Sequence, residues 1–307
     1  MHRTVLKKRI AQHWQLYLFL LLPIIYLIVF KYYPMLGVQI AFKKYSAKLG
    51  IWGSPWVGFR YFERFFKSTM FKRVVGNTIS ISLYSLIAGF PLPILFALML
   101  NIMRNPRYKK FAQTITYMPH FISTVVLVGM LMQILNPITG IYGKLYSILN
   151  NGTMPSDPFA SPNTFPHLYV WSGIWQHFGW DSIIYVAALS SVSPELHEAA
   201  QVDGASRLQR VWHVDFPALL PTAIIMLILR SGSIMTIGFE KIFLMQNDLN
   251  LRASEVISTY VYKISLKASI PDFSYSTAIG LFNSVVNLII IFFVNVFARK
   301  VSDTSLW

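Results

Sequence analysis

Cysteine is missing from this 307-residue chain, and acidic residues are scarce, with 12 Asp and Glu against 27 Lys and Arg. Without cysteine the chain can form no disulfide and carry out no thiol chemistry. Only 13% of its residues are charged, against roughly 25% in an ordinary soluble domain. Most of its surface must therefore face something other than water.

Sequence motifs for phosphate binding and catalysis are also missing. The chain has no Gly-x-x-x-x-Gly-Lys-Ser/Thr string, no His-x-x-x-His pair and no Gly-x-Ser-x-Gly elbow. We therefore expect no catalytic residue, no metal site and no cofactor in the chain. The net charge of +15 raises nucleic acid as a partner, but the basic residues cluster beside apolar runs, where anionic lipid headgroups attract them.

Long apolar runs are what the chain does have. About 20 such residues in a helix cross the hydrocarbon core of a bilayer, and helices satisfy their own backbone groups there. We predict an all-α membrane protein with six transmembrane helices. The first apolar run follows basic residues and lacks a small-residue cleavage site, so we read it as a retained span. The six predicted spans are residues 14–30, 78–100, 111–135, 168–190, 218–239 and 275–297.

Two long loops lie between the predicted spans. Residues 31–77 are rich in aromatic residues, which is typical of an interfacial amphipathic segment. Residues 136–166 are rich in Asn, Gly and Pro, and we expect no regular structure there.

A polar island separates the fourth and fifth runs. Ser193, Pro194 and Glu195 form a helix start, with a serine cap, a proline in the first turn and a carboxylate at the positive end of the helix dipole. Gly204 predicts a sharp break, and Pro217 is expected to close the unit. We therefore predict two short helices that meet at an angle along the membrane surface.

The order of residues in this island resembles the EAA loop of ABC importer permeases. Glu-Ala-Ala at 198–200 precedes Asp-Gly-Ala at 203–205, and a Phe-Pro pair follows at 216–217. In that family the loop docks on a cytoplasmic ATPase. An ordinary amphipathic loop explains any one of these residues, but not the whole ordered string. The resemblance assigns ATPase coupling to Glu198, Ala199, Ala200, Asp203, Gly204, Ala205, Val211, Trp212 and Pro217.

Other segments resemble the oligosaccharide branch of these permeases, the LplB-like proteins. The strings at 118–123, 180–185, 238–242 and 275–284, and the ending at 305–307, carry this likeness. It implies a type I importer permease fold of the MetI-like, maltose-permease-like kind. It divides the chain into residues 1–77 (tail, first helix and interfacial segment), a permease core at 78–300 with the EAA loop at 191–221, and a tail at 301–307.

The family also implies partners for the chain. A second permease subunit, usually non-identical, would complete the path for the oligosaccharide, and an extracytoplasmic solute-binding protein would deliver it. Two ATPase subunits would bind ATP and Mg, so this chain would be a transport subunit and not an enzyme.

Orientation and location follow from the same resemblance. Lys and Arg are spread almost evenly over the two sides, although their density before the first span and at 101–111 favours a cytoplasmic N-terminus. The EAA loop must meet a cytoplasmic ATPase, which places the N-terminus inside. We expect a multi-pass protein of the bacterial inner membrane.

Polar residues inside the predicted spans are candidates for the substrate path. Asp181 and Arg230 fall near mid-depth, and we favour a structural ion pair over a substrate contact. Trp175 and Trp180 suit either sugar rings or the membrane interface. Further candidates for the path are Gln176, Asn283 and Asn287, where hydrogen bonds between helices are the alternative for the two asparagines.

Three other functions are alternatives to an oligosaccharide permease. An ion-coupled secondary transporter would need acids buried in several spans, whereas Asp181 is the only mid-span acid. A membrane enzyme would need paired carboxylates or a nucleophile at the end of a span. An ABC importer permease for a non-sugar solute stays open. The basic balance outside favours anionic sugars, but lipid contact explains it equally well.

Overall fold

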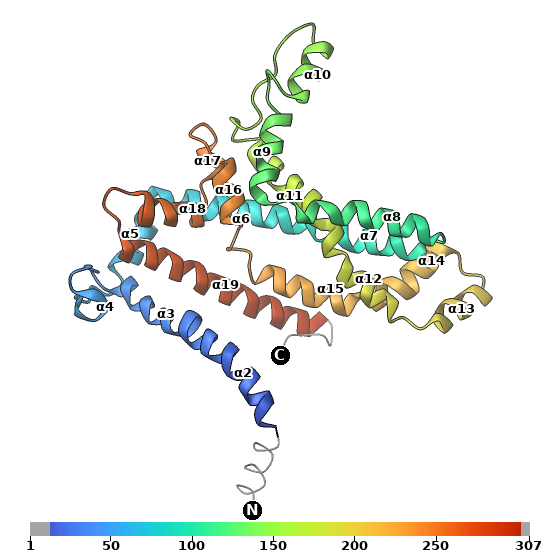
Figure 1. Ribbon diagram of the computed structural model, residues 1–307, viewed down its shortest axis with the longest axis horizontal. Coiled ribbons are helices and arrows are strands. Elements are labelled where there is room, and N and C mark those ends of the chain that lie inside the picture. The colour runs from blue at the N-terminus through green and yellow to red at the C-terminus, as the bar shows by residue number, and fades with distance from the viewer. Residues whose placement is uncertain (1–12, 302–307) are drawn as a thin grey trace, which may run out of the picture. The chain divides into compact units, whose positions relative to one another are not determined.

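The computed structural model describes residues 13–301, so the terminal residues 1–12 and 302–307, including the ending at 305–307, lie outside the described part. The described residues fold into helices joined by loops (Figure 1), and their β-structure is limited to one bridge between Lys43 and Trp56. This confirms the all-α prediction. The chain forms two compact units, one made of residues up to Phe66 with 264–281, the other of 67–263 with the segment from Phe282 onward. The expected division at 77 and 300 stays a prediction.

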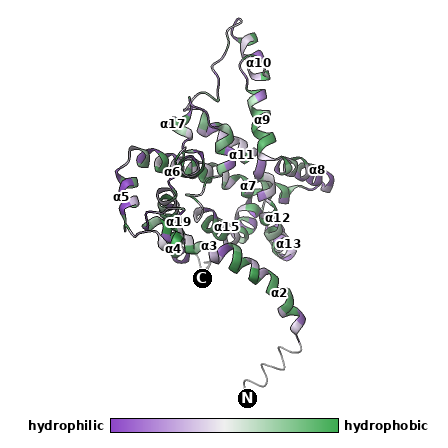
Figure 2. Ribbon diagram, turned by 60° about the vertical axis from the view of Figure 1, so that its left-hand side comes forward, coloured by the Kyte–Doolittle hydropathy of each residue, from purple (hydrophilic) through white to green (hydrophobic). Residues whose placement is uncertain are grey.

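The first unit begins with a continuous helical run of 29 residues, Trp14–Phe42. The run is longer than the predicted first span because a π-helical turn carries it past Lys31. None of its apolar window is buried, and Figure 2 shows α2 as hydrophobic almost throughout. Its parts are α2 (Trp14–Leu27), the π-turn η1 (Ile28–Tyr32), α3 (Tyr33–Met35) and the 3-10 turn η2 (Leu36–Phe42).

Two short helices, α4 (Gly50–Gly53) and α5 (Arg60–Lys67), follow in the segment predicted to be interfacial. Hydrogen bonds tie residues 264–281 to this unit. The Ser274 hydroxyl accepts from Tyr45 N at 2.9 Å and donates to Lys43 O at 2.7 Å. Arg64 pairs with Asp272 at 2.7 Å.

The second unit opens with α6 (Thr69–Gly89) and α7 (Pro91–Ile102), a run of 34 residues that is long and apolar enough to cross a membrane. It starts nine residues before the predicted second span. Ser68 caps it, since its hydroxyl accepts from Phe71 N. The two helices meet at Phe90, where Pro91 occupies the first turn of α7 and needs no hydrogen-bond acceptor.

The predicted third span is sharply bent. It consists of α8 (Pro106–Tyr117), the 3-10 turn η3 (Met118–Phe121) and α9 (Thr124–Ile134), with an angle of 98° at the break. The Ser123 hydroxyl caps α9 by accepting from Val126 N, and Gln176 Nε2 donates to Ile122 O at 2.8 Å. These bonds satisfy the backbone groups that the bend releases.

The predicted fourth span is interrupted as well. It falls on α11 (Phe165–Asp181), of 17 residues, and α12 (Ile183–Ser190), of 8, which meet at Ser182. In the described chain, four helices are long and apolar enough to span, or five if the bent pair counts as one span. The predicted number of six transmembrane helices therefore stays a prediction, because neither half of the broken, polar fourth span is long and apolar enough to be counted.

The loop at 136–166 contains a helix, contrary to the prediction. The segment α10 (Ile141–Leu149) starts at Gly140, after a turn in which the Asn136 side chain accepts from Ile138 N and Thr139 N at 2.9 Å each. Turn-forming residues here begin a helix, whereas we expected them to exclude one.

The remaining elements include the last two long helices. The predicted fifth span lies in a continuous helical run, Arg207–Ser231, which ends eight residues before the expected end, and the sixth lies in α19. These elements are α13 (Pro194–Val202), α14 (Arg207–Arg210), the π-turn η4 (Val211–Asp215), α15 (Phe216–Ser231), α16 (Phe239–Met245), α17 (Leu251–Ser254), α18 (Ile257–Tyr262), the π-turn η5 (Lys263–Lys267) and α19 (Phe273–Val301).

Two apolar clusters hold the second unit together. One surrounds Phe165 and Ile242, between α11 and α16, and the other surrounds Tyr185 and Leu219, between α12 and α15. Figure 1 shows α12 beside α15 in agreement with this packing. Burying such a side chain contributes roughly 1.5–3 kcal/mol. The clusters thus fix α11, α12, α15 and α16 around the polar groups described next.

Candidate functional site

The polar island forms the short helix α13 and, after a tight turn, the start of a second helix at α14. The turn agrees with the prediction, but the second helix is not short, because it continues to Ser231. The first, α13, is capped by Ser193, whose hydroxyl accepts from Glu195 N at 3.3 Å. Glu198 and Ala199 are exposed on its surface. The residues around the turn are also exposed, with Val202 at 88% and Leu208 at 68%. Val202 and Leu208 therefore present apolar surface on both sides of the turn.

The turn at Gly204 has a geometry that only a few residue types adopt. Gly204 has a φ of +78°. Its N–H donates to Gln201 O at 3.0 Å, and the Ala205 N–H donates to Ala200 O at 2.9 Å. These two bonds are those of the Schellman motif, which ends a helix with a left-handed residue. The backbone therefore favours glycine over residues with a branched side chain here, and the predicted break is confirmed.

A capping box that the sequence reading missed starts the second helix. The Ser206 hydroxyl accepts from Gln209 N, and Gln209 Oε1 accepts from Ser206 N at 2.7 Å. The spacing Ser-x-x-Gln was visible in the sequence. The capping box and the Schellman motif together fix both sides of the turn by local hydrogen bonds.

Pro217 does not close this unit, so that prediction was wrong. It lies in the first turn of α15, and the helical run continues through it from Arg207 to Ser231. The π-turn at Val211–Asp215 widens the helix just before the proline, where a normal turn would place a carbonyl against the ring. One helix of 25 residues therefore begins in the loop and ends among the spans.

Asp215 ties the loop to a neighbouring span. It is only 2% exposed, and its Oδ1 accepts from Asn101 Nδ2 at 3.0 Å and lies 3.2 Å from His197 Nε2. Asn101 lies near the end of α7, and His197 lies on α13. No sequence signal had marked these three residues, since they are far apart along the chain.

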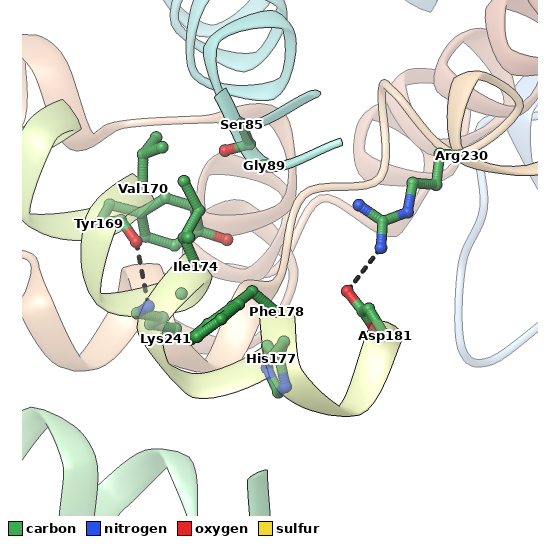
Figure 3. Close-up of a pocket in the computed structure, with 11 residues that line it drawn as sticks. Ser85, Gly89, Tyr169, Val170, Ile174, His177, Phe178, Asp181, Arg230 and Lys241 are labelled. Atoms are coloured by element: carbon green, nitrogen blue, oxygen red, sulfur yellow. Dashed lines mark hydrogen bonds and ion pairs between the residues drawn. The ribbon is translucent and has the colours of Figure 1, made fainter. Parts of the chain in front are cut away.

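A cavity of about 230 Å³ opens between α6, α11, α15 and α16 (Figure 3). Asp181 and Arg230 face each other across it, with Arg230 Nη2 2.5 Å from Asp181 Oδ2. Both side chains are partly exposed, with 27% of the Arg230 side chain and 31% of the Asp181 side chain accessible to solvent. The expected ion pair is confirmed, and it lines the cavity.

Lys241 is a second cation of this cavity, and the sequence reading passed over it. Its residue is 8% exposed, its Nζ donates to Tyr169 O at 3.0 Å, and it lies 5.0 Å from the centre of the Tyr169 ring. Figure 3 shows the lysine beside Tyr169 on α11. Lys241 belongs to α16, outside the helices long enough to span. Burial lowers the pKa of its ammonium to about 8, so it is mostly charged at neutral pH.

A second cavity of about 230 Å³ adjoins the first and shares Ser85, Tyr169 and Arg230 with it. Its wall adds the hydroxyl residues Ser82, Ser233 and Thr236. The two cavities together offer two cations, one carboxylate and several hydroxyl groups. Such a lining is suited to a ligand with many hydroxyls and a negative charge.

The other candidates for the substrate path lie elsewhere. Gln176 is 4% exposed and bonded to Ile122 O, and Trp180 stacks on His120 at 4.3 Å. Trp175, 46% exposed, lines a separate apolar groove. These three residues do not line either polar cavity, so their path role stays a prediction.

The two asparagines of α19 differ in their contacts. Asn287 Oδ1 accepts from Met235 N at 2.9 Å, and its Nδ2 donates to Thr236 Oγ1 at 2.8 Å. It therefore holds the chain just after α15, as the hydrogen-bonding alternative predicted. Asn283 Oδ1 is buried without a partner in the described part of the chain.

Comparison with known proteins shows which family has this sequence and architecture. Residues 89–303 match the family described as binding-protein-dependent transport system inner membrane component. Protein LplB of Bacillus subtilis (strain 168) is 41% identical over 292 residues, which cover 95% of this chain and 91% of LplB. The polygalacturonan/rhamnogalacturonan transport system permease protein YteP of the same strain is 39% identical, with 97% and 92% covered.

Solved structures agree over nearly the whole chain. A chain of a bacterial ABC transporter involved in the import of the acidic polysaccharide alginate matches with a TM-score of 0.87 and 40% identity, covering 97% of this chain and 99% of its own. A second structure, of a bacterial alginate ABC transporter in complex with an alginate pentasaccharide-bound periplasmic protein, matches with a TM-score of 0.88 and 39% identity, with the same coverage. The chain therefore belongs to the binding-protein-dependent transport system inner membrane components, the permeases of ABC importers, as its EAA-like loop predicted.

Proposed function

We propose that this permease carries acidic oligosaccharides, those with uronic-acid carboxylates, across the bacterial cytoplasmic membrane. The observation that carries the proposal is the charge of the cavity at Asp181. Arg230 and Lys241 bring two positive charges to it, and Asp181 neutralises one of them. The remaining charge belongs to the buried ammonium of Lys241, which has no carboxylate partner in the described chain. A sugar carboxylate would supply that partner.

The relatives support an acidic sugar. Their printed names refer to polygalacturonan and rhamnogalacturonan for YteP and to the acidic polysaccharide alginate for the matching importer. The hydroxyl residues of the adjoining cavity, Ser82, Ser233 and Thr236, suit the neutral part of such a ligand. A second permease subunit would complete the path, and a periplasmic binding protein would deliver the sugar.

The exposed loop from α13 to α14 is the proposed docking site for the ATPase subunits. Glu198, Ala199, Asp203 and Val202 are open to solvent and free to contact a partner. Two such partners would bind the ATP and Mg that this chain has no motif to hold, and the loop and the N-terminus would both be cytoplasmic. The N-terminal residues 1–12 themselves lie outside the described part of the chain.

One helix links the proposed docking site to the proposed sugar path. The run Arg207–Ser231 begins beside Gly204 and carries Arg230 at its far end. At a rise of ~1.5 Å per residue it spans about 35 Å. A rigid helix of this length would transmit a movement of the loop directly to the cavity. This gives ATP-driven motion a physical route to the substrate.

Lys241→Met tests the proposed sugar class. The experiment uses the importer assembled with its partner subunits in proteoliposomes and compares uptake of an oligogalacturonate with uptake of its carboxyl-reduced counterpart. Loss of a charge-assisted hydrogen bond costs about 1.5–3 kcal/mol. We expect the concentration for half-maximal uptake of the acidic sugar to rise about tenfold or more, with uptake of the neutral sugar nearly unchanged.

The control is Lys110→Met, which removes an exposed lysine outside both cavities. It should leave uptake of either sugar unaltered. Raising the pH through about 8 should imitate Lys241→Met for the acidic sugar, because burial lowers the pKa of this ammonium and it loses its proton there. Equal losses for both sugars in Lys241→Met would show that the lysine has only a structural role.

A further inference from the structure

A third cavity lies apart from the sugar path, between the end of α7, helix α13 and the α14–η4 turn. It measures about 390 Å³, and polar groups make up most of its wall. Three arginines line it: Arg104 in the connection between α7 and α8, and Arg207 and Arg210 on α14. Neither the family motif nor the proposed sugar path gives these arginines a role.

The charge in this cavity is unbalanced. Asp215 is the only carboxylate in its wall, and that side chain already binds Asn101 and His197. None of the three guanidinium groups forms an ion pair with another described residue. Arg210 Nε is moreover buried with no acceptor within the described chain. Buried donors in native proteins almost always have partners, so this one points to an acceptor that the chain itself does not supply.

Arginine clusters of this kind fit a phosphate group. The guanidinium fork donates two parallel hydrogen bonds to oxygens of a tetrahedral anion, and its weak hydration favours partly buried pairs. A lone sugar or nucleobase would leave the charge uncompensated, so the ligand should be an anion. A phosphate suits the site because its several oxygens can pair with more than one guanidinium group.

The surroundings indicate that this phosphate belongs to the membrane. The cavity begins where the apolar run of α7 ends, and Met99 and Met103 are 61% and 41% exposed there. Trp212, next to the lining residue Val211, is 61% exposed. Tryptophan and a basic pocket at the end of an apolar helix are the features that hold a lipid headgroup at the membrane surface.

We propose that this cavity binds the phosphate of an anionic membrane lipid, with Arg207 and Arg210 on one side and Arg104 on the other. The arginines of α14 move with the coupling loop, whereas Arg104 follows the end of a span. A shared phosphate would join the two parts, beside the protein's own link through Asp215. Occupancy by lipid would then stabilise the position of the loop.

The test uses the assembled importer in nanodiscs that contain phosphatidylglycerol and phosphatidylcholine. The lipid retained after detergent extraction is counted by native mass spectrometry. The double variant Arg207→Gln and Arg210→Gln should retain about 25-fold less phosphatidylglycerol, since each basic residue near an anionic surface contributes about a factor of five. Arg104→Gln alone should give a smaller loss in the same direction. The matched control Lys110→Gln and Arg299→Gln removes two exposed charges outside the cavity and should lower retention much less than the double variant does.

Three results would overturn the lipid assignment. One is equal retention of phosphatidylglycerol in the double variant and the control, with both complexes intact by size-exclusion chromatography. Another is displacement of the lipid by millimolar inorganic phosphate together with equal retention of phosphatidylcholine, which would assign the site to free phosphate. The third is unchanged lipid with weakened binding of the ATPase subunits in detergent, which would assign the arginines to a carboxylate of that partner.

Discussion

Gly204→Val is expected to lower sugar-stimulated ATP hydrolysis of the assembled importer at least about tenfold. The residue has a φ of +78°, and a side chain placed there would meet nothing within 4 Å. The effect therefore comes from the backbone alone. A β-branched residue in the left-handed region costs at least about 1–2 kcal/mol, and the chain avoids this cost by opening the turn between α13 and α14.

The control for this prediction is Gly204→Asn at the same position. Asparagine tolerates the left-handed region, so the turn should form and stimulated hydrolysis should stay within about twofold of the native rate. Binding of the ATPase subunits should follow the same order, measured by co-purification. If valine and asparagine gave the same rate, the shape of the turn would have no part in coupling.

Arg230→Met is expected to lower both the stability of the complex and its uptake of the acidic sugar, and Asp181→Asn should lower both to a similar extent. Each variant leaves one charge of the pair without its partner in the cavity between α11 and α15. Both groups are partly exposed, so solvent screening reduces the free energy cost of the unpaired charge. For residues in contact, coupling free energies are roughly 0.5–3 kcal/mol. The measurements are the melting temperature of the purified complex and the uptake of the acidic sugar.

The double variant separates a structural role of this pair from a substrate contact. If the pair only holds the two helices, removal of both charges should restore most of the stability that either single change loses. Because the pair carries no net charge, its joint removal leaves the charge of Lys241 in the cavity, so transport of an acidic sugar should recover together with stability. Transport that stays impaired in a stable double variant would show that Arg230 also contacts the sugar. Additive losses of stability in the double variant would show that Asp181 and Arg230 do not act as a pair.

Local rules explain why the helix start and the turn of the proposed docking loop were predictable from the sequence. Ser193, Pro194 and Glu195 define a helix start by their own chemistry, and Gly204 defines its end. Each of these signals acts within a few residues, so no knowledge of the tertiary fold is needed. The helical class followed equally directly from apolar runs long enough to cross a bilayer.

Contacts between distant segments explain what the sequence could not give. Lys241 reaches the cavity only because α16 packs on α11, and Asp215 meets Asn101 across more than a hundred residues. The 98° bend before α9 depends on Gln176 to bind the freed carbonyl of Ile122. Pro217 was misjudged because a π-turn in front of it lets the helix continue.

The most direct test of the account uses the absence of cysteine from the chain. Ala199→Cys places a single thiol on the exposed surface of α13, where a thiol-reactive cross-linker and a membrane-impermeant maleimide can both reach it. We expect cross-linking to an ATPase subunit, and labelling in inside-out vesicles but not in intact cells. Labelling of intact cells, or a thiol that never cross-links to an ATPase in a complex that still transports, would contradict the assignment of this loop.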